Sequence, residues 1–282
     1  MKVRIAALLL LVAAAGYVST SGLAIDPWRF GLLMLTGFLA SAGASAINHY
    51  IDRDLDSLMG RTRARPLPAH RIEPPGRALG FGLGLSLVAL GVAYLGLNPL
   101  TAGMIGLGLF VYVGVYTLGL KRTHASNIVI GGFAGSCPAL AGSAAAVGVL
   151  SAPAILLAVL VFLWTPGHFW ALAYRSREDY RRAGIPMLPA VSDERTTVRA
   201  IAVSTALVPV ATLGFYLTPA FGLPFLVAAA LGGGILLALT WRFVRRPSVE
   251  TAWAGYKFSG TYLAIVLVGA MLDAVVAHRL VP

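Results

Sequence analysis

The stretch RFGLLMLTGFLASAGASAINHYIDRDLD, residues 29–56, joins a long apolar run to a polar segment with three aspartates. No Lys, Arg, Asp or Glu lies between Phe30 and Ile51. A run of about 20 apolar residues can cross the hydrocarbon core of a bilayer as one α-helix. The stretch therefore predicts a membrane helix that ends in an acidic segment at the membrane surface.

The composition of the whole chain also indicates a membrane protein. Of its 282 residues, 58% are hydrophobic and 12% are charged, about half the share of roughly 25% that soluble domains carry. A soluble domain of this size cannot bury so much apolar surface, so the composition excludes a soluble enzyme and a disordered chain. The single cysteine, Cys137, excludes an intrachain disulfide and a cysteine pair for zinc.

Apolar runs of similar length recur along the chain, and Pro, Asn and Ser residues separate many of them. We expect an all-α fold, a polytopic membrane bundle of about nine transmembrane helices. The expected helices cover residues 5–24, 29–49, 78–97, 100–120, 125–147, 152–174, 199–217, 223–241 and 253–277. The first run follows two basic residues, Lys2 and Arg4, so a cleaved signal peptide is the alternative to a retained helix there.

The chain is expected to form a single transmembrane domain over residues 1–282. One charged loop, residues 50–77, follows the second expected helix, and another, residues 175–198, follows the sixth. This spacing indicates pseudo-repeat halves of about 1–124 and 125–282.

The charge balance is strongly basic, with 22 Lys and Arg against 11 Asp and Glu and a formal net charge of +11. In a soluble protein this excess would indicate nucleic acid. Here the basic residues gather in alternate loops, so we expect no nucleic-acid partner, and a lipid bilayer instead. The positive-inside rule places the N-terminus and the charged loops in the cytoplasm of a prokaryotic cell (inner) membrane, with the C-terminus outside.

Asn48, Asp52 and Asp56 follow one another at intervals of four residues. On an α-helix each such step climbs about 6 Å and turns about 40° past a full circle, so the three side chains line one stripe, whereas Asp54 points away. Mg²⁺ prefers oxygen ligands and binds one or two carboxylates together with substrate phosphates. The spacing predicts a metal site, and interfacial ion pairs with nearby arginines are the alternative.

Basic residues follow this stripe in the segment RTRARPLP, residues 61–68. Because proline favours an extended conformation in the residue before it, we expect Arg61, Arg63 and Arg65 to share one side and to grip phosphate. A membrane-surface anchor is the alternative. Lys121 and Arg122 end the fourth expected helix, which by itself is a common stop-transfer pattern.

A second polar segment lies in WTPGHFWALAYRSREDYRRAGIPMLP, residues 164–189. Glu178 and Asp179 are candidates to hold a second Mg²⁺, with a solvated loop as the alternative. His168 lies inside the sixth expected helix, where an ionisable residue indicates function. Ligation of iron, proton transfer and a hydrogen bond to a neighbouring helix all remain open for this histidine.

Four segments together resemble the UbiA-type intramembrane prenyltransferases and, within them, the protohaem IX farnesyltransferase (haem O synthase) family. The segments run from Asn48 to Asp56, from Leu120 to Gly132, from Trp164 to Trp170 and from Glu178 to Pro189, and they agree with that family in order and spacing.

The resemblance implies a bundle around a central cavity and Mg²⁺-dependent transfer of a farnesyl group from farnesyl diphosphate to a vinyl group of haem B. It further implies haem A synthase as a protein partner. By motif match, Asn48, Asp52, Asp56 and Asp179 would hold the metal, with Glu178 as the further candidate named above, and Asp52, Asp56, Asp179 and Lys121 would be catalytic. His168 is the candidate haem contact, and the diphosphate would bind Arg61, Arg65, Lys121, Arg122, Tyr174 and Arg177.

Two other functions remain open at this point. The segment from Asn48 to Asp56 also fits prenyl transfer to an aromatic quinone precursor. A membrane transporter or a haem-binding module is the alternative from a different class, because charges near helix ends also bind ions in transporters.

Overall fold

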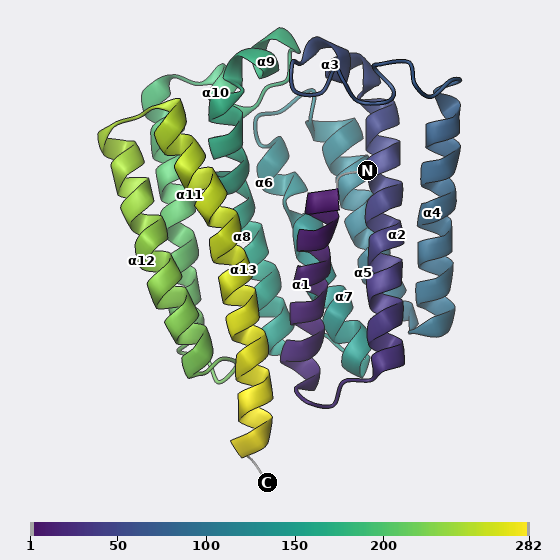
Figure 1. Cartoon of the computed structure of the whole chain (residues 1–282), viewed down its shortest axis with the longest axis vertical. Helices are drawn as coiled ribbons and strands as arrows, with labels where there is room; N and C mark the ends of the chain where they lie inside the picture. Colours follow the sequence, from purple (N-terminus) through teal and green to yellow (C-terminus); the bar gives the residue numbers. More distant parts are fainter. Residues whose placement is uncertain (1–2, 281–282) are drawn as a thin grey trace.

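The computed structural model describes residues 3–280 as helices joined by short loops, with side chains described for residues 5–276 (Figure 1). This confirms the all-α fold, and a helix is present at each expected position with ends that differ by a few residues. The long segments are α1 (Val3–Ser21), α2 (Pro27–Ile51), α4 (Gly76–Gly96), α5 (Pro99–Phe110) with η1 (Val111–Leu120), α6 (Asn127–Gly131) with α7 (Phe133–Val147), α8 (Ala152–Arg175), α11 (Glu194–Phe215), α12 (Leu223–Arg245) and α13 (Val249–Leu280). Within the described residues, 8 of these segments are long and apolar enough to cross a membrane, and the apolar part of α1, Ile5–Ser21, is shorter.

The long helices are arranged in a closed ring. Each contacts the next in the order α1, α2, α4, α5, α7, α8, α11, α12, α13, and α13 returns to contact α1. In Figure 1, α1 lies between α2 and α13, and it also contacts α7 and α8 across the ring.

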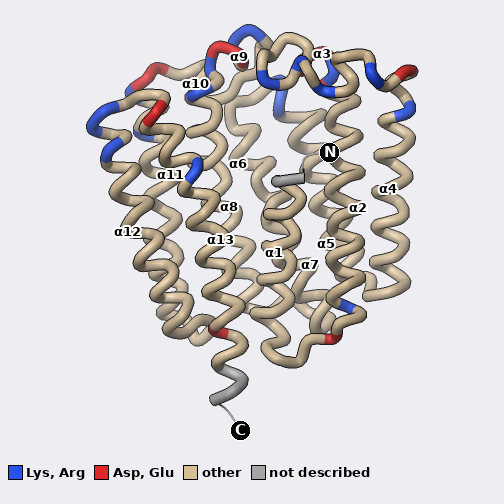
Figure 2. Tube along the Cα trace, in the orientation of Figure 1, with Lys and Arg blue, Asp and Glu red and all other residues tan. Residues whose placement is uncertain are grey.

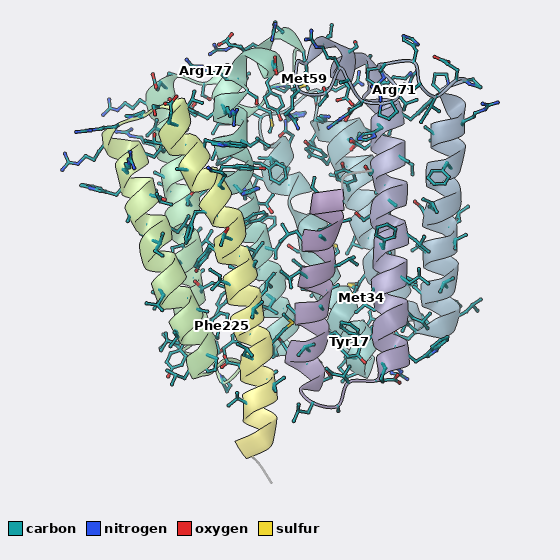
Figure 3. The ribbon with its side chains drawn as sticks, viewed as in Figure 1. Tyr17, Met34, Met59, Arg71, Arg177 and Phe225 are labelled. Atoms are coloured by element: carbon teal, nitrogen blue, oxygen red, sulfur yellow. The ribbon has the colours of Figure 1, made fainter. Side chains whose placement is uncertain are left out.

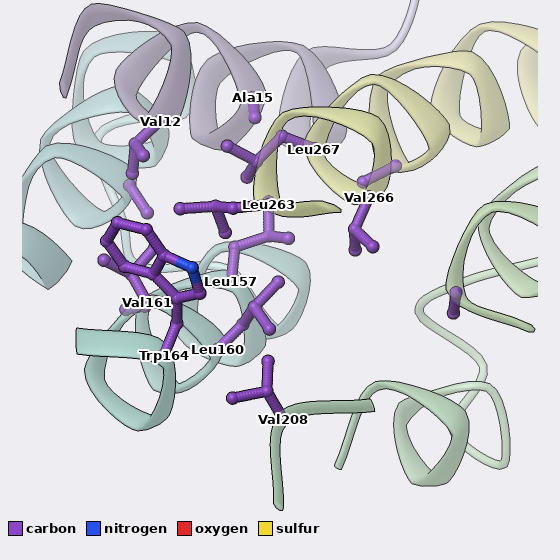
Figure 4. Packing of buried hydrophobic residues seen from close by; sticks show 14 of the residues in the cluster. Val12, Ala15, Leu157, Leu160, Val161, Trp164, Val208, Leu263, Val266 and Leu267 are labelled. Atoms are coloured by element: carbon purple, nitrogen blue, oxygen red, sulfur yellow. The ribbon is translucent and has the colours of Figure 1, made fainter. Parts of the chain in front are cut away.

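The outer surface of the ring is apolar, as a bilayer requires. Leu87, Leu95, Leu217 and Leu231 expose between 69% and 87% of their surface. Inside, buried apolar side chains join three helices: Trp164 of α8, Leu263 of α13 and Val12 of α1 belong to one cluster (Figure 4). The long helices thus carry apolar side chains on both their outer and their inner faces.

Helix α1 is held closely against α7 by small residues. A Cβ atom added to Gly142 would lie 2.2 Å from the carbonyl oxygen of Ala13, and one added to Gly16 would lie 2.1 Å from that of Ala139. Glycine at such positions lets two membrane helices approach until their backbones touch. The small residues from Ala13 to Gly16 in α1 therefore form a packing surface against α7.

Charged residues gather at one end of the bundle, around three short helices that the sequence did not predict (Figure 2). These are α3 (Arg53–Leu58), α9 (Arg177–Arg182) and α10 (Leu188–Val191). Figure 3 shows Met59, Arg71 and Arg177 at this end, and Tyr17 and Phe225 toward the opposite end. This charged end carries all the predicted site residues except His168, which lies within α8.

The expectation of an extended segment at residues 61–65 is wrong. The N–H groups of Thr62 and Arg63 both donate to the carbonyl oxygen of Met59 at 3.0 Å, and that of Arg65 donates to Thr62 at 2.9 Å. The Thr62 hydroxyl also donates to the Asp56 carbonyl oxygen, which fixes the turns against α3. Consecutive turns bring Arg61 and Arg65 to the cavity described below, while Arg63 stays on the surface.

Candidate active site

The predicted stripe persists although α2 ends at Ile51. The N–H of Asp52 donates to Asn48 at 2.9 Å, and that of Asp56 donates to Asp52 at 2.8 Å, so the bonding between residues four apart continues into α3. Both aspartate side chains are buried. Asp54 faces outward, as the spacing predicts, and pairs with Arg122 at 2.7 Å.

Each buried carboxylate has a cationic partner from another part of the chain. Asp52 Oδ2 accepts hydrogen bonds from Lys121 Nζ and from Asn48 Nδ2, the latter at 2.7 Å. Asp56 Oδ2 accepts one from Arg65 Nη1 at 2.6 Å. The second oxygen of Asp52, Oδ1, is buried without a hydrogen-bond partner among the described residues.

Lys121 reaches Asp52 because the chain before it forms a π-helix, η1. The N–H of Lys121 donates to the Tyr116 carbonyl oxygen five residues earlier at 2.8 Å, and the Thr117 hydroxyl donates to that of Tyr112 at 2.7 Å. The same hydroxyl accepts a hydrogen bond from Asn48 Nδ2 at 3.2 Å. π-helical turns are frequent at functional sites, and this one stacks the rings of Tyr112 and Tyr116 with centroids 5.9 Å apart.

A cavity of about 700 Å³ lies inside the ring beneath the charged end. Its polar mouth contains Asn48, Asp56, Arg61, Arg65 and Lys121. Beyond the mouth, apolar and aromatic side chains of α1, α2, α5, η1, α7 and α8 line it, and the tyrosines of η1 lie between these two regions. Charged and polar side chains line the mouth and suit an ionic group, whereas the interior suits an apolar chain or ring.

The residues at the mouth fit a hard divalent cation. No group of three His, Cys, Asp or Glu side chains converges on one point among the described residues, so a complete cage of charged protein ligands is absent there. Asp52 Oδ1, which has no hydrogen-bond partner among the described residues, and the Asp56 carboxylate, which lines the cavity one helical turn further on, are instead two candidate ligands. This is the ligand set that Mg²⁺ uses when phosphates and water complete its shell. Lys121 and Arg65 pair with these two carboxylates, and Arg61 also lines the mouth, which leaves positive charge for an anion.

The two acidic residues predicted in the second polar segment lie in different surroundings. Asp179 pairs with Arg182. Both its carboxylate oxygens lie 3.7 Å from the position that a Cβ on Gly60 would occupy, so Asp179 faces the loop that follows α3. Glu178 is 68% exposed and pairs with Arg181. The structure thus brings Asp179 to the edge of the site and leaves Glu178 in solvent.

Tyr174, Arg177 and Arg122 do not line the cavity. The Tyr174 hydroxyl donates to Glu194 at 2.7 Å, and the guanidinium of Arg177 lies 5.7 Å from the centre of the Tyr174 ring. Arg122 donates to both carboxylate oxygens of Asp54, and this hydrogen bond lowers the pKa of Asp54 and raises that of Arg122. These three side chains support the charged end from outside the cavity.

His168 lines the cavity among aromatic rings of two helices. The ring of Trp164 stacks on it with centroids 4.1 Å apart, and that of Tyr256 lies 4.4 Å away. Its Nδ1 is 2.7 Å from the hydroxyl oxygen of Ser259 on α13. The histidine is therefore held in a fixed orientation at the cavity wall.

Sequence reasoning missed Thr117, Tyr112, Tyr116, Tyr180 and Ser259. Tyr180 lines the cavity, where burial raises its pKa and the charge of Arg61 opposes that shift. No local pattern in the sequence indicates the π-helical turns of η1, which appear only in the backbone hydrogen bonds of the structure. No local pattern indicates Ser259, which meets His168 only through tertiary packing.

The fold and the cavity define a class of protein: a polytopic membrane protein with an apolar chamber beneath a mouth suited to a divalent cation and a phosphate group. The chain belongs to the UbiA prenyltransferase family, whose sequence profile matches residues 9–267.

Proteins of similar sequence agree with this placement. The chain is 44% identical over 278 residues to protoheme IX farnesyltransferase 1 of Cenarchaeum symbiosum (strain A), covering 97% of this chain and 93% of that protein. It is 40% identical over 273 residues to protoheme IX farnesyltransferase of Pyrobaculum neutrophilum, with 97% and 98% covered.

Solved structures show the same fold at much lower identity. Digeranylgeranylglyceryl phosphate synthase superposes with a TM-score of 0.77 at 20% identity, covering 97% of this chain and 99% of that one. A UbiA homologue from Archaeoglobus fulgidus, solved bound to GPP and Mg²⁺, gives a TM-score of 0.66 at 15% identity, with 95% and 97% covered.

Proposed function

We propose that this chain transfers a farnesyl group from farnesyl diphosphate to a vinyl group of haem B, giving haem O, in a reaction that requires Mg²⁺. Relatives at 40–44% identity over nearly the whole chain carry the name protoheme IX farnesyltransferase. The observation that carries the proposal is the joining of a cation-rich mouth to an apolar chamber within one cavity. Farnesyl diphosphate has the same two parts, an anionic head and an apolar tail.

The mouth residues act on the diphosphate end. The bond from C1 of the farnesyl chain to the diphosphate oxygen breaks, and negative charge develops on the leaving group. Lys121, Arg65 and Arg61 line the mouth with cationic groups that stabilise this charge as it forms. Mg²⁺, when held by Asp52, Asp56 and Asn48, supplies further charge neutralisation of the phosphates.

The chamber protects and directs the allylic cation that ionisation leaves. Tyr112 and Tyr116 lie between the mouth and the apolar interior, where their ring faces attract a cation. The vinyl carbon of haem B then bonds to C1 of the farnesyl chain, and water adds to the resulting cation as hydroxide and releases a proton. His168 is the proposed haem contact, and no protein nucleophile takes part.

The surroundings follow from the charge distribution. Lys and Arg concentrate at the end that holds α3 and α9 (Figure 2), so the positive-inside rule places the mouth on the cytoplasmic side of a prokaryotic cell membrane. The pseudo-repeat halves remain a proposal about how the chain arose. The product would pass to haem A synthase, the partner that the family resemblance implies.

An acceptor assay tests the proposal. Purified protein with farnesyl diphosphate and Mg²⁺ should release diphosphate and form a farnesylated product with haem B, and should do neither with a hydroxybenzoate. Prenylation of the hydroxybenzoate instead of haem B would contradict the proposed acceptor. Release of no diphosphate with either acceptor would contradict a transferase.

A further inference from the structure

We propose that Ser259 fixes the tautomer of His168, so that Nε2 faces the cavity as the ligand to the iron of the tetrapyrrole acceptor. Ser259 would thus be a positioning residue that acts through His168. This inference rests on the proposed function, because it takes an iron tetrapyrrole as the acceptor. To the proposed function it adds His168 Nε2 as the atom that binds the iron and Ser259 as the residue that sets its protonation state.

The hydrogen bonds of Ser259 determine where the imidazole proton lies. Its hydroxyl donates to the carbonyl oxygen of Tyr256 at 2.9 Å, which uses its only hydrogen. The same oxygen lies 2.7 Å from His168 Nδ1, and with the hydroxyl hydrogen assigned to Tyr256 it is the acceptor of a hydrogen bond from Nδ1–H. In the neutral ring the proton is then on Nδ1, and Nε2 carries a lone pair.

Nε2 opens onto the cavity. His168 is partly exposed and lines the cavity, and its bond to Ser259 is the one hydrogen bond that it makes among the described residues. Nε2 is also absent from the fully enclosed side-chain atoms that lack a partner, so it retains accessible surface. A lone pair directed into an apolar chamber is ready to bind a metal without breaking an existing contact.

The ring cannot turn easily, because two helices hold it. Trp164 Nε1 donates to the carbonyl oxygen of Ser259 at 2.9 Å, so the same residue of α13 anchors both Trp164 and His168 of α8. The rings of Trp164 and Tyr256 lie close to the imidazole at 4.1 and 4.4 Å. Rotation about the ring axis would break the Ser259 bond and disturb both aromatic contacts.

This arrangement matches how proteins prepare a histidine for iron. Metal-bound histidines almost always donate their other ring N–H to a fixed acceptor, which sets the tautomer and the orientation. Here the acceptor is a serine hydroxyl, and the rings of Trp164 and Tyr256 pack on the imidazole at inclinations of 27° and 30°, beside apolar walls. A planar macrocycle with a central metal has the chemistry that fits, whereas a free metal ion finds no group of three His, Cys, Asp or Glu side chains around His168 within the part of the chain that the structure describes.

Spectra of haem B bound to the purified full chain in detergent test the inference. The central variants are Ser259→Thr and Ser259→Val, which have nearly the same shape and differ in the hydroxyl. This pair is sharper than Ser259→Ala, because a pocket of about 20 Å³ adjoins Ser259 and admits a water that can replace the lost hydroxyl. Ser136→Ala is the control, since its buried hydroxyl also joins two helices, through the Ala158 carbonyl oxygen at 2.7 Å, but does not touch histidine.

We expect the wild-type chain and Ser136→Ala to give the spectrum of imidazole-ligated iron. His168→Gly should lose that spectrum and regain it when free imidazole is added. Ser259→Val should bind haem about tenfold more weakly with a smaller ligated fraction, in the range found when such supporting partners are removed. Ser259→Thr should stay close to wild type.

Three results would overturn the inference. Equal spectra and affinities for Ser259→Thr and Ser259→Val would remove the role of the hydroxyl, and an unchanged spectrum in His168→Gly would remove the ligand. If either occurs while haem B is still farnesylated, the proposed function stands and the inference alone fails. If the wild-type chain neither binds nor farnesylates haem B, the proposed acceptor fails with it.

Discussion

The acidic segments that follow α2 and α8 differ in burial more than in sequence. The side chains of Asp52 and Asp56 are 0% and 4% exposed, whereas those of Asp179 and Glu178 are 19% and 68% exposed. The partners differ as well. Lys121 comes to Asp52 from a distant helix, whereas Arg181 and Arg182 lie three residues from their acids on the same short helix.

The comparison shows that acidic residues at a helix end acquire different roles through tertiary contacts. Burying an ionised carboxylate is costly even when a cation pairs with it, so the first segment is kept at a cost that a functional role explains. Exposed pairs such as those of the second segment contribute little to stability and leave their carboxylates hydrated. We therefore place the metal chemistry in the first segment, with Asp179 at its edge.

The largest effect is expected from Asp52→Asn, which removes a negative charge and keeps the size of the side chain. The rate of farnesyl transfer should fall by about 1000-fold, the upper range for loss of one group that stabilises developing charge. Asp54→Asn is the matched control, because Asp54 is two residues away but exposed, and its rate should stay within about twofold. Equal losses in both variants would remove the distinction between buried and exposed acids.

An intermediate effect is expected from Asp179→Asn. Its carboxylate faces the loop at Gly60, is 19% exposed and already pairs with Arg182, so the rate should fall by about tenfold, well short of the loss of a buried group that stabilises developing charge. The Mg²⁺ concentration that gives half the maximal rate should rise in parallel. A loss as large as that of Asp52→Asn would make the second segment an equal metal site.

A small effect, less than about twofold, is expected from Glu178→Gln, because the side chain is 68% exposed and pairs only with arginines among the described residues. Steady-state rates with farnesyl diphosphate and haem B measure it. A loss of tenfold or more would show that α9 moves Glu178 into the site when substrate binds.

The smallest effect concerns the pH dependence of stability at Asp54. Its pKa in the folded protein is lowered by the Arg122 hydrogen bond, so the ionised pair stabilises the fold above the ordinary value of 3.8. That contribution is lost as pH falls through the lower folded pKa. Because Asp54 is 59% exposed, the gain is at most about 0.5 kcal/mol after solvent screening. Melting temperatures of wild type and Asp54→Asn in detergent should therefore differ slightly at neutral pH and converge in acid, and a difference that grows in acid would reverse the assigned sign.

The sequence predicted the long helices well because their length depends on a local property. A run of about 20 apolar residues crosses a bilayer whatever its neighbours are, and the helical period places Asn48, Asp52 and Asp56 on one stripe. The prediction for residues 61–65 failed because the preference of a single proline was outweighed by turns tied to α3.

Features set by contacts between distant segments were beyond local reasoning. Lys121 and Arg122 form one basic pair in sequence, yet one reaches buried Asp52 and the other reaches exposed Asp54. Adjacent helical side chains point about 100° apart, so the register of η1 decides which of them enters the site. Glu178 is likewise exposed because of where α9 lies, and the sequence of α9 alone does not determine that position.

Mass spectrometry of haem extracted from membranes that express the chain tests the central claim most directly. Wild type should yield haem B enlarged by one farnesyl group and one hydroxyl, Asp54→Asn should yield the same product, and Asp52→Asn should yield unmodified haem B. Unmodified haem in wild-type membranes supplied with farnesyl diphosphate and Mg²⁺ would contradict the proposed reaction. Full product from Asp52→Asn would contradict the assignment of that reaction to the buried acidic segment.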